Sequence, residues 1–245
     1  MVAKKRLDLF LVEKGLVAHR NRARAEIMCG NVRVDGKVCT KPGTNVSSSS
    51  EIEILQDESP YVSRGGLKLA GAAKDLGFNF QSKIVLDAGA STGGFTDFAL
   101  HQGALKVYAI DVGYGQLDWN LRQSSRVVVI ERTNIRYLKP EHLAEVPDIA
   151  TVDVSFISLQ KILPVLAHVG IPEIIALIKP QFEVGKDKVG KKGVVKDPAV
   201  HREVIKEIEN FAAGLNLQLM GTTVSCLKGP QGNTEFFMYW ILQKS

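Results

Sequence analysis

A glycine-rich turn directly after an apolar, strand-like segment is the feature that most constrains the fold of this 245-residue chain. Val85-Leu-Asp87 is typical of the end of a buried strand, and Ala-Gly89-Ala-Ser-Thr-Gly93-Gly94 follows it as a turn that opens a helix. Glycines let the backbone approach a ligand closely, and the N–H groups at a helix start can face that ligand. The pattern predicts a ligand site at the carboxyl end of a strand in an α/β sheet.

The spacing of these glycines disfavours two common nucleotide-binding classes. The dinucleotide fingerprint G-x-G-x-x-G is absent, because three residues separate Gly89 from Gly93, and no P-loop lysine follows Gly94. A second acid, Asp111, ends the next strand-like segment 24 residues after Asp87. An acid at that place can accept hydrogen bonds from both hydroxyls of an adenosine ribose. The two acids and the glycine turn together resemble nucleoside-dependent methyltransferases.

Strand-like and helix-like segments alternate over the rest of this part of the chain. The predicted strands are Ile84–Asp87, Lys106–Asp111, Arg126–Ile130, Ile149–Val152, Ile174–Ile178, Leu217–Val224 and Phe236–Leu242. The predicted helices span residues 64–76, 94–102, 156–168 and 198–213. This alternation predicts an α/β fold, with a largely parallel sheet covered by helices on both faces. Only a short loop separates the last two strands, so they should form an antiparallel hairpin.

The first 56 residues predict a separate, small α+β module. We expect helices at 6–15 and 20–29, a hairpin of Val32–Val34 and Lys37–Cys39, a polar loop at 44–50, and a strand at 51–55. Charge, serine and proline mark a linker after this module. The predicted domains are therefore 1–56 and 64–245, joined by residues 57–63.

Positive charge is concentrated in the first fifth of the chain. Residues 1–50 hold ten Lys and Arg against four Asp and Glu, whereas the remaining residues carry a net charge of −1. A concentrated positive charge attracts polyanions at long range. The alternative interpretation is a solvated, lysine-rich surface without a binding role. We find no apolar segment long enough for a signal peptide or a membrane span. Three scattered cysteines, Cys29, Cys39 and Cys226, predict no disulfide framework and no metal site, in keeping with a cytoplasmic chain.

Four ionisable residues lie where methyl-transfer chemistry is expected. Lys68 precedes the first strand of the sheet, Asp153 and Lys179 end two later strands, and Glu235 opens the last strand. Their order, Lys-Asp-Lys-Glu, resembles the catalytic tetrad of the FtsJ-like ribose methyltransferases. The chain as a whole resembles the hemolysin A (TlyA) family. The resemblance is carried by Arg64-Gly-Gly-Leu-Lys68-Leu, the turn at Asp87, Asp111-Val-Gly-Tyr-Gly-Gln, Asp153-Val-Ser-Phe-Ile-Ser and Gly193-Val-Val-Lys-Asp-Pro198.

This resemblance implies a Rossmann-like class I methyltransferase domain that uses S-adenosylmethionine and acts on a ribose 2′-hydroxyl, of cytidine, in ribosomal RNA. Lys179 would polarise or deprotonate the hydroxyl. Asp153 and Glu235 would orient Lys179 and balance charge, and Lys68 would hold the hydroxyl or a phosphate. The implied cofactor-binding residues are Asp87, Gly89, Ser91, Gly93, Gly94, Phe95, Asp111 and Asn134. Asn134 could instead only cap a turn.

The N-terminal module resembles the RNA-binding domain named after ribosomal protein S four. The matching segments are Arg6-Leu-Asp, Arg20-x-Arg22-Ala-Arg24 and Gly30-Asn-Val-Arg33-Val-Asp-Gly-Lys37, while His19 and Asp35-Gly36 depart from the usual serine and Asn-Gly. The implied RNA-binding residues are Arg6, Arg20, Arg22, Arg24, Arg33 and Lys37. The expected partner is ribosomal RNA or a ribosomal subunit, without a membrane. The segment 183–196, with five lysines, is either a lid over RNA or simply solvated.

Two other functions are compatible with this organisation. One is a catalytically idle RNA-binding factor of ribosome assembly, which the intact tetrad disfavours. The other is a membrane-active hemolysin, which the lack of an apolar or strongly amphipathic insertion segment disfavours.

Overall fold

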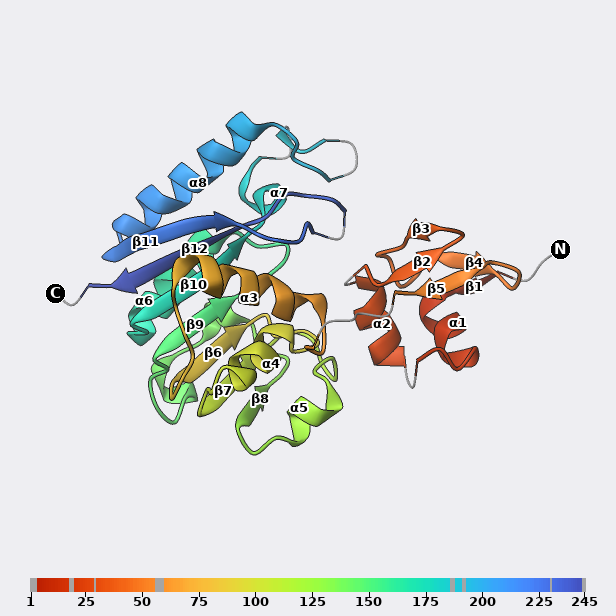
Figure 1. Cartoon of the computed structure of the whole chain (residues 1–245), viewed down its shortest axis with the longest axis horizontal. Helices are drawn as coiled ribbons and strands as arrows, with labels where there is room; N and C mark the ends of the chain where they lie inside the picture. The colour runs from red at the N-terminus through yellow and green to blue at the C-terminus, as the bar shows by residue number, and fades with distance from the viewer. Residues whose placement is uncertain are drawn as a thin grey trace. The chain divides into compact units, whose positions relative to one another are not determined.

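The computed structural model divides the chain into two compact units, residues 1–60 and 61–245 (Figure 1). The division falls inside the predicted linker 57–63. The structure describes residues 4–17, 20–28, 30–55, 60–185, 188–190, 193–229 and 231–243. His19, Cys29, linker residues 57–59 and lysines 186, 191 and 192 of the lysine-rich segment lie outside these ranges.

The N-terminal unit combines two helices with two small antiparallel sheets. Its elements are β1 (Lys4–Arg6), α1 (Leu7–Glu13), α2 (Arg20–Met28), β2 (Val32–Val34), β3 (Lys37–Val38), β4 (Asn45–Ser47) and β5 (Ile52–Ile54). The predicted hairpin is confirmed, because β2 pairs with β3 in antiparallel register. Asp35 and Gly36 both have positive φ, 49° and 75°, as a two-residue hairpin turn of the primed type requires.

One expectation for this unit is wrong. Residues 44–50 are not only a polar loop, because β4 pairs with β1 and Val46 lies opposite Lys5. Val46 is buried in the core of the unit with Leu7, Leu11 and Ile27. The polar serines after Val46 do not predict a strand. The strand forms because its hydrogen-bond partners lie in a segment 41 residues earlier in the chain.

The C-terminal unit is built on one seven-stranded sheet in the order β11-β12-β10-β9-β6-β7-β8. Its strands are β6 (Ile84–Ala88), β7 (Lys106–Ile110), β8 (Val127–Ile130), β9 (Ile149–Val152), β10 (Glu173–Ile178), β11 (Leu217–Val224) and β12 (Phe236–Leu242). The helices are α3 (Arg64–Leu76), α4 (Gly94–His101), α5 (Trp119–Gln123), α6 (Leu163–Val169), α7 (Pro180–Glu183) and α8 (Pro198–Ala213), with short 3₁₀ helices η1 (Ile135–Tyr137), η2 (Pro140–His142) and η3 (Leu159–Lys161). Strands β6 to β10 run parallel, and β12 is antiparallel to both β10 and β11, as predicted.

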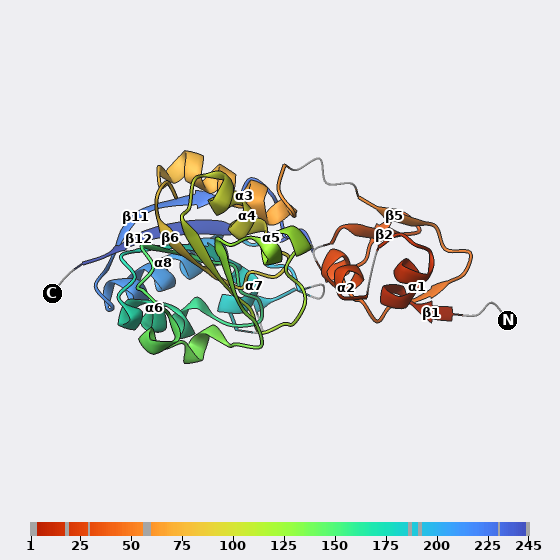
Figure 2. The same cartoon turned by 90° about the horizontal axis from the view of Figure 1, so that it is seen from below.

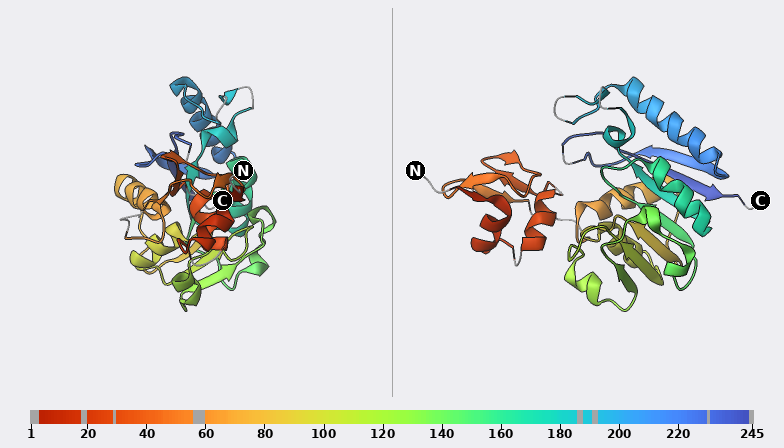
Figure 3. Two further views of the ribbon diagram at one scale, coloured as in Figure 1. Left: turned by 90° about the vertical axis from the view of Figure 1, so that its right-hand side faces the viewer. Right: turned by 180° about the vertical axis from the view of Figure 1, so that it is seen from behind.

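Alternate residues of each strand enter two separate hydrophobic cores. On one face, Val85 and Val107 pack with residues of α3, α4 and α5. On the other, Leu86 and Tyr108 pack with α6 and α8. Figure 2 shows the sheet between these two helical layers, and the right panel of Figure 3 shows α8 beside the last two strands. This arrangement confirms the predicted sheet with helices on both faces.

The helix expected at 156–168 begins later than predicted. Residues Leu159–Lys161 form η3 and α6 begins at Leu163, with Pro164 in its first turn. Phe156 has a left-handed backbone, with φ 65°, so a helix cannot begin there. Proline tolerates only the first turn of a helix, which explains the position at which α6 begins. In the described ranges, no helix is long and apolar enough to cross a membrane.

Candidate active site

The predicted site residues of the C-terminal unit gather at one edge of the sheet. Strands β6, β7, β9 and β10 are parallel, so their carboxyl ends share this edge. Strand β12 runs in the opposite direction, and its first residue Phe236 pairs with Ile178 at the end of β10. Lys179 and Glu235 therefore stand one position beyond the last paired residues of neighbouring strands. Strand β6 lies between β7 and β9, so the strand order reverses direction at β6. Ligands bind at the carboxyl ends of the strands at such a point.

The glycine turn between β6 and α4 is tight and lies against the loop that follows β9. Gly89, Ser91 and Gly93 have positive φ values of 87°, 49° and 97°. A Cβ atom at Gly89 would stand 2.4 Å from the carbonyl oxygen of Asp153, so only glycine permits this approach. The turn thus brings the N-terminus of α4 beside the residues that follow β9.

Asp87 supports this turn from the interior of the protein. Its side chain is fully buried and accepts hydrogen bonds from the hydroxyls of Thr96, at 2.7 Å, and Thr151, at 3.1 Å. Burial raises the pKa of the Asp87 carboxyl from 3.8 to about 7, against the lowering effect of these two hydroxyls. The carboxyl therefore links β6, α4 and β9 inside the protein.

Asp111 connects the end of β7 to the same turn. Its carboxylate accepts hydrogen bonds from the backbone N–H of Ser91, at 2.8 Å, and of Gly113, at 2.6 Å. Asn134 lies after β8, and its side-chain oxygen accepts from the N–H of Arg136 at 3.1 Å. The capping role that the sequence left open for Asn134 is thus present.

The four residues of the Lys-Asp-Lys-Glu set form two ion pairs. The Nζ atom of Lys68, on α3, donates to Oε2 of Glu235 at 2.6 Å, and both side chains are buried. The Nζ atom of Lys179 lies 2.5 Å from Oδ1 of Asp153. The hydroxyl oxygen of Ser155 accepts from the same Nζ at 3.1 Å. Each lysine is therefore held by one carboxylate at the sheet edge.

Sequence reasoning missed an aromatic pair next to this set. Phe156 is 85% exposed although it is a large apolar residue, and its ring centroid lies 4.9 Å from that of Phe182 on α7. A positive φ at a bulky residue is unusual and is often retained at functional sites. The only sequence signal was the phenylalanine in Asp153-Val-Ser-Phe, three residues after the acid.

Asn233 was also missed, two residues before Glu235. Its side chain is 2% exposed, accepts from the N–H of Val195 and donates to the carbonyl of Gly193, both at 2.9 Å. These bonds attach the end of the lysine-rich segment to the turn that carries Glu235.

The six predicted RNA-binding residues all belong to the N-terminal unit. Arg6 and Arg20 both bind Asp8, Arg22 pairs with Glu26 at 2.6 Å, and Arg33 pairs with Glu53 at 3.3 Å. Arg24 and Lys37 are exposed. In the described part of the chain, no three His, Cys, Asp or Glu residues gather as a metal site would require.

A parallel sheet that ends in an antiparallel hairpin, with a glycine turn after β6 and an acid after β7, defines a Rossmann-like methyltransferase. The family models for the FtsJ-like methyltransferases and the S4 domain match residues 61–241 and 5–52, respectively. The chain therefore belongs to the FtsJ-like methyltransferase family and contains an S4 domain.

Relatives of known name cover nearly the whole chain. It is 47% identical over 239 residues to the "Putative rRNA methyltransferase YqxC" of Bacillus subtilis, covering 96% of this chain and 85% of that protein. It is 44% identical over 242 residues to the 16S/23S rRNA (cytidine-2′-O)-methyltransferase TlyA of Mycobacterium tuberculosis, covering 98% and 90%. A solved structure, "Putative hemolysin from Streptococcus thermophilus", superposes with a TM-score of 0.77 at 38% identity, covering 100% and 90%.

Proposed function

We propose that this methyltransferase transfers a methyl group from S-adenosylmethionine to the ribose 2′-hydroxyl of a cytidine in ribosomal RNA, in the cytoplasm. The proposal rests on two ion pairs at the edge of the sheet beside the glycine turn, Lys68–Glu235 and Lys179–Asp153. The named activities of the relatives support the choice of ribosomal RNA and of cytidine.

The residues at this edge fit the proposed donor. The close approach of Gly89 to Asp153 leaves no room for a side chain between the glycine turn and the loop that follows β9, so a ligand bound at the turn would lie next to Asp153. Residues 89–95 would hold the methionine portion, Asp111 the ribose hydroxyls and Asn134 the adenine. Asp87 would support the turn from the interior. When bound, S-adenosylmethionine supplies an electrophilic methyl group on a positively charged sulfur.

The two ion pairs give the lysines different tasks. A ribose hydroxyl is a weak nucleophile, so a group within hydrogen-bond reach must take its proton as the new O–C bond forms. The neutral amine form of Lys179 takes this proton at Nζ and becomes an ammonium, which Asp153 then stabilises through Oδ1, 2.5 Å away. Lys68, fixed by Glu235, stabilises the negative charge that develops on the ribose oxygen. The remaining acceleration comes from aligning the hydroxyl with the methyl group.

Phe156 offers the nucleotide a stacking surface. Its exposed ring, supported by Phe182, stands three residues after Asp153. If the target base leaves its stack when its ribose enters the site, stacking on an aromatic side chain compensates for the lost contact. The S4 domain, with its excess of basic residues, would supply the sequence-independent contacts to the RNA backbone.

The test is tritiated-methyl transfer to ribosomal subunits, and to rRNA extracted from them, taken from cells that lack the protein. Label in 2′-O-methylcytidine supports the proposal, whereas label on a base contradicts it. Lys179→Ala should abolish transfer while calorimetry still detects donor binding. Lys161→Ala, which removes an exposed lysine of η3, is the matched control and should retain full activity. Normal turnover by Lys179→Ala would refute the role of the lysine.

A further inference from the structure

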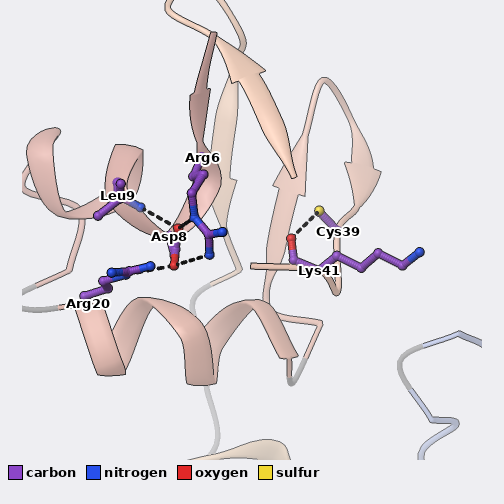
Figure 4. A network of polar contacts seen from close by, with 6 residues as sticks. All are labelled: Arg6, Asp8, Leu9, Arg20, Cys39 and Lys41. Carbon is purple, nitrogen blue, oxygen red and sulfur yellow. Dashed lines mark hydrogen bonds and ion pairs between the residues drawn. The ribbon is translucent and has the colours of Figure 1, made fainter. Parts of the chain in front are cut away.

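Asp8 carries a buried negative charge in the unit that should bind a polyanion. It lies in the first turn of α1, between Arg6 at the end of β1 and Arg20 at the start of α2 (Figure 4). Its side chain has no exposed surface. Charge counting alone makes Asp8 unfavourable for binding RNA, so its position needs another explanation.

The carboxylate of Asp8 is fully used by hydrogen bonds. Arg6 donates from Nε to Oδ1 at 3.0 Å and from Nη2 to Oδ2 at 2.9 Å, so this pair is bidentate. Arg20 donates from Nε to Oδ2 at 2.9 Å, and the N–H of Leu9 donates to Oδ1 at 3.1 Å. A carboxylate accepts about four hydrogen bonds, which these contacts supply. The hydrogen bond from Arg6 lowers the pKa of Asp8 to about 2, so its charge is constant at ordinary pH.

The two arginines remain accessible although their partner is buried. Their side chains are 46% and 52% exposed, respectively. The bonds to Asp8 use Nε and Nη2 of Arg6 but only Nε of Arg20. A Cβ atom at Gly43 would lie 3.3 Å from Nη1 of Arg6, so the guanidinium group rests against the backbone at that glycine. Asp8 thus fixes the orientation of two arginines from β1 and α2 whose outer N–H groups lie at the surface.

We propose that Asp8 is a positioning residue that holds Arg6 and Arg20 together as one site for an RNA backbone phosphate. The inference rests on the proposed function, in which the S4 domain binds RNA. Arginine side chains are long and flexible, and binding ordinarily requires that they be ordered. Here the Asp8 carboxylate orders both in the unbound protein. Guanidinium groups that are ordered in advance suit the bidentate recognition of phosphate.

The test compares RNA binding by the full chain and its Asp8→Asn variant, with fluorescently labelled rRNA transcript as the probe. Removing a negative charge should tighten binding if charge alone matters. If Asp8 positions the arginines, the Kd should rise about tenfold. The slope of log Kd against log salt should stay unchanged, because the number of basic residues is the same. Glu13→Gln is the matched control: it removes an exposed acid that pairs with Lys5 at 2.6 Å, and should bind as tightly as the wild type or more tightly.

A double-variant comparison separates positioning from a merely structural role. In an Arg6→Ala/Arg20→Ala background, Asp8→Asn should no longer weaken binding, because the side chains that it positions are gone. The Kd for S-adenosylmethionine and kcat at saturating RNA should stay at the wild-type values, while KM for RNA rises. If Asp8→Asn does not fold, as a thermal melt would show, Gly43→Ala replaces it. The added methyl group displaces only the end of Arg6 and should also raise the Kd.

The outcomes distinguish this inference from the proposed function. If Arg6→Ala and Arg20→Ala weaken RNA binding but a folded Asp8→Asn binds as well as the wild type, the positioning role is wrong and RNA binding by the S4 domain stands. An equal loss in both backgrounds also overturns the positioning role. If neither arginine variant weakens binding, RNA binding by this face fails, and the proposed function loses its contact to the RNA backbone.

Discussion

The buried carboxyl of Asp87 should make the stability of the methyltransferase unit depend on pH. Its pKa is about 7 in the folded protein, against 3.8 without the protein environment. Because the folded-state pKa is the higher one, the folded chain holds this proton more tightly than the unfolded chain. The resulting stabilisation is complete below about pH 4 and is lost as the pH rises through 7.

The size of this effect follows from the two pKa values. The full difference corresponds to about 4 kcal/mol, of which about 3 kcal/mol is lost between pH 5 and pH 8. With a denaturant dependence of about 2 kcal/mol per molar urea, the unfolding midpoint should fall by about 1.5 M between these pH values. Asp87→Asn removes the titration but keeps the shape, since its amide can bond to the hydroxyls of both Thr96 and Thr151. Its midpoint should vary far less with pH.

Urea denaturation of the full chain at pH 5 and pH 8, followed by circular dichroism, measures both midpoints. The wild type and Asp87→Asn share all other titrating groups, so the contributions of those groups to the pH dependence cancel in the comparison. Asp148→Asn is the matched control, because this exposed acid of the same unit should leave the pH dependence at the wild-type value. Equal pH dependence in Asp87→Asn and the wild type would refute the reasoning.

Three further variants test the site. Asp111→Ala leaves the N–H groups of Ser91 and Gly113 without their acceptor, so the Kd for S-adenosylmethionine should rise at least tenfold by calorimetry, about 1.4 kcal/mol; an unchanged Kd would contradict this role. Phe156→Ala should raise KM for RNA about tenfold while Phe156→Tyr does not, and equal kinetics of both would exclude stacking. Asn233→Ala should speed hydrogen exchange at the amide of Val195 and lower kcat, since two bonds to the segment after Gly190 are lost; unaltered exchange would show that other contacts hold this segment.

Much of the fold follows from local sequence patterns. Strands β6 and β7 place apolar side chains on both faces of the sheet. This pattern by itself predicts a sheet covered by helices on each side. Asp35-Gly36 supplies the two positive φ values that its hairpin needs, and the short loop before Glu235 allows only an antiparallel last strand. These signals are local, because they depend on periodicity and backbone preference within a few residues.

The sequence also determined which residues of the candidate site come together, because parallel strands end at one edge. Lys179, Asp153 and Glu235 each follow or precede a predicted strand, and Lys68 lies on the helix before the first of them. The sequence assigned both carboxylates to Lys179, whereas in the structure Asp153 pairs with Lys179 and Glu235 pairs with Lys68. That pairing depends on strand order, with β10 between β9 and β12, which no local pattern specifies.

Only the tertiary structure decided the remaining features, because each depends on groups far apart in the chain. Strand β4 exists because β1 provides its hydrogen bonds, although Asn45 and Ser47 are polar. Asp87 has a pKa of about 7 because α4 and β9 exclude water from it. Arg6 and Arg20 of the S4 domain are held by Asp8 because β1 and α2 converge on one carboxylate. Burial and long-range pairing set these properties, and a linear sequence carries no direct measure of either.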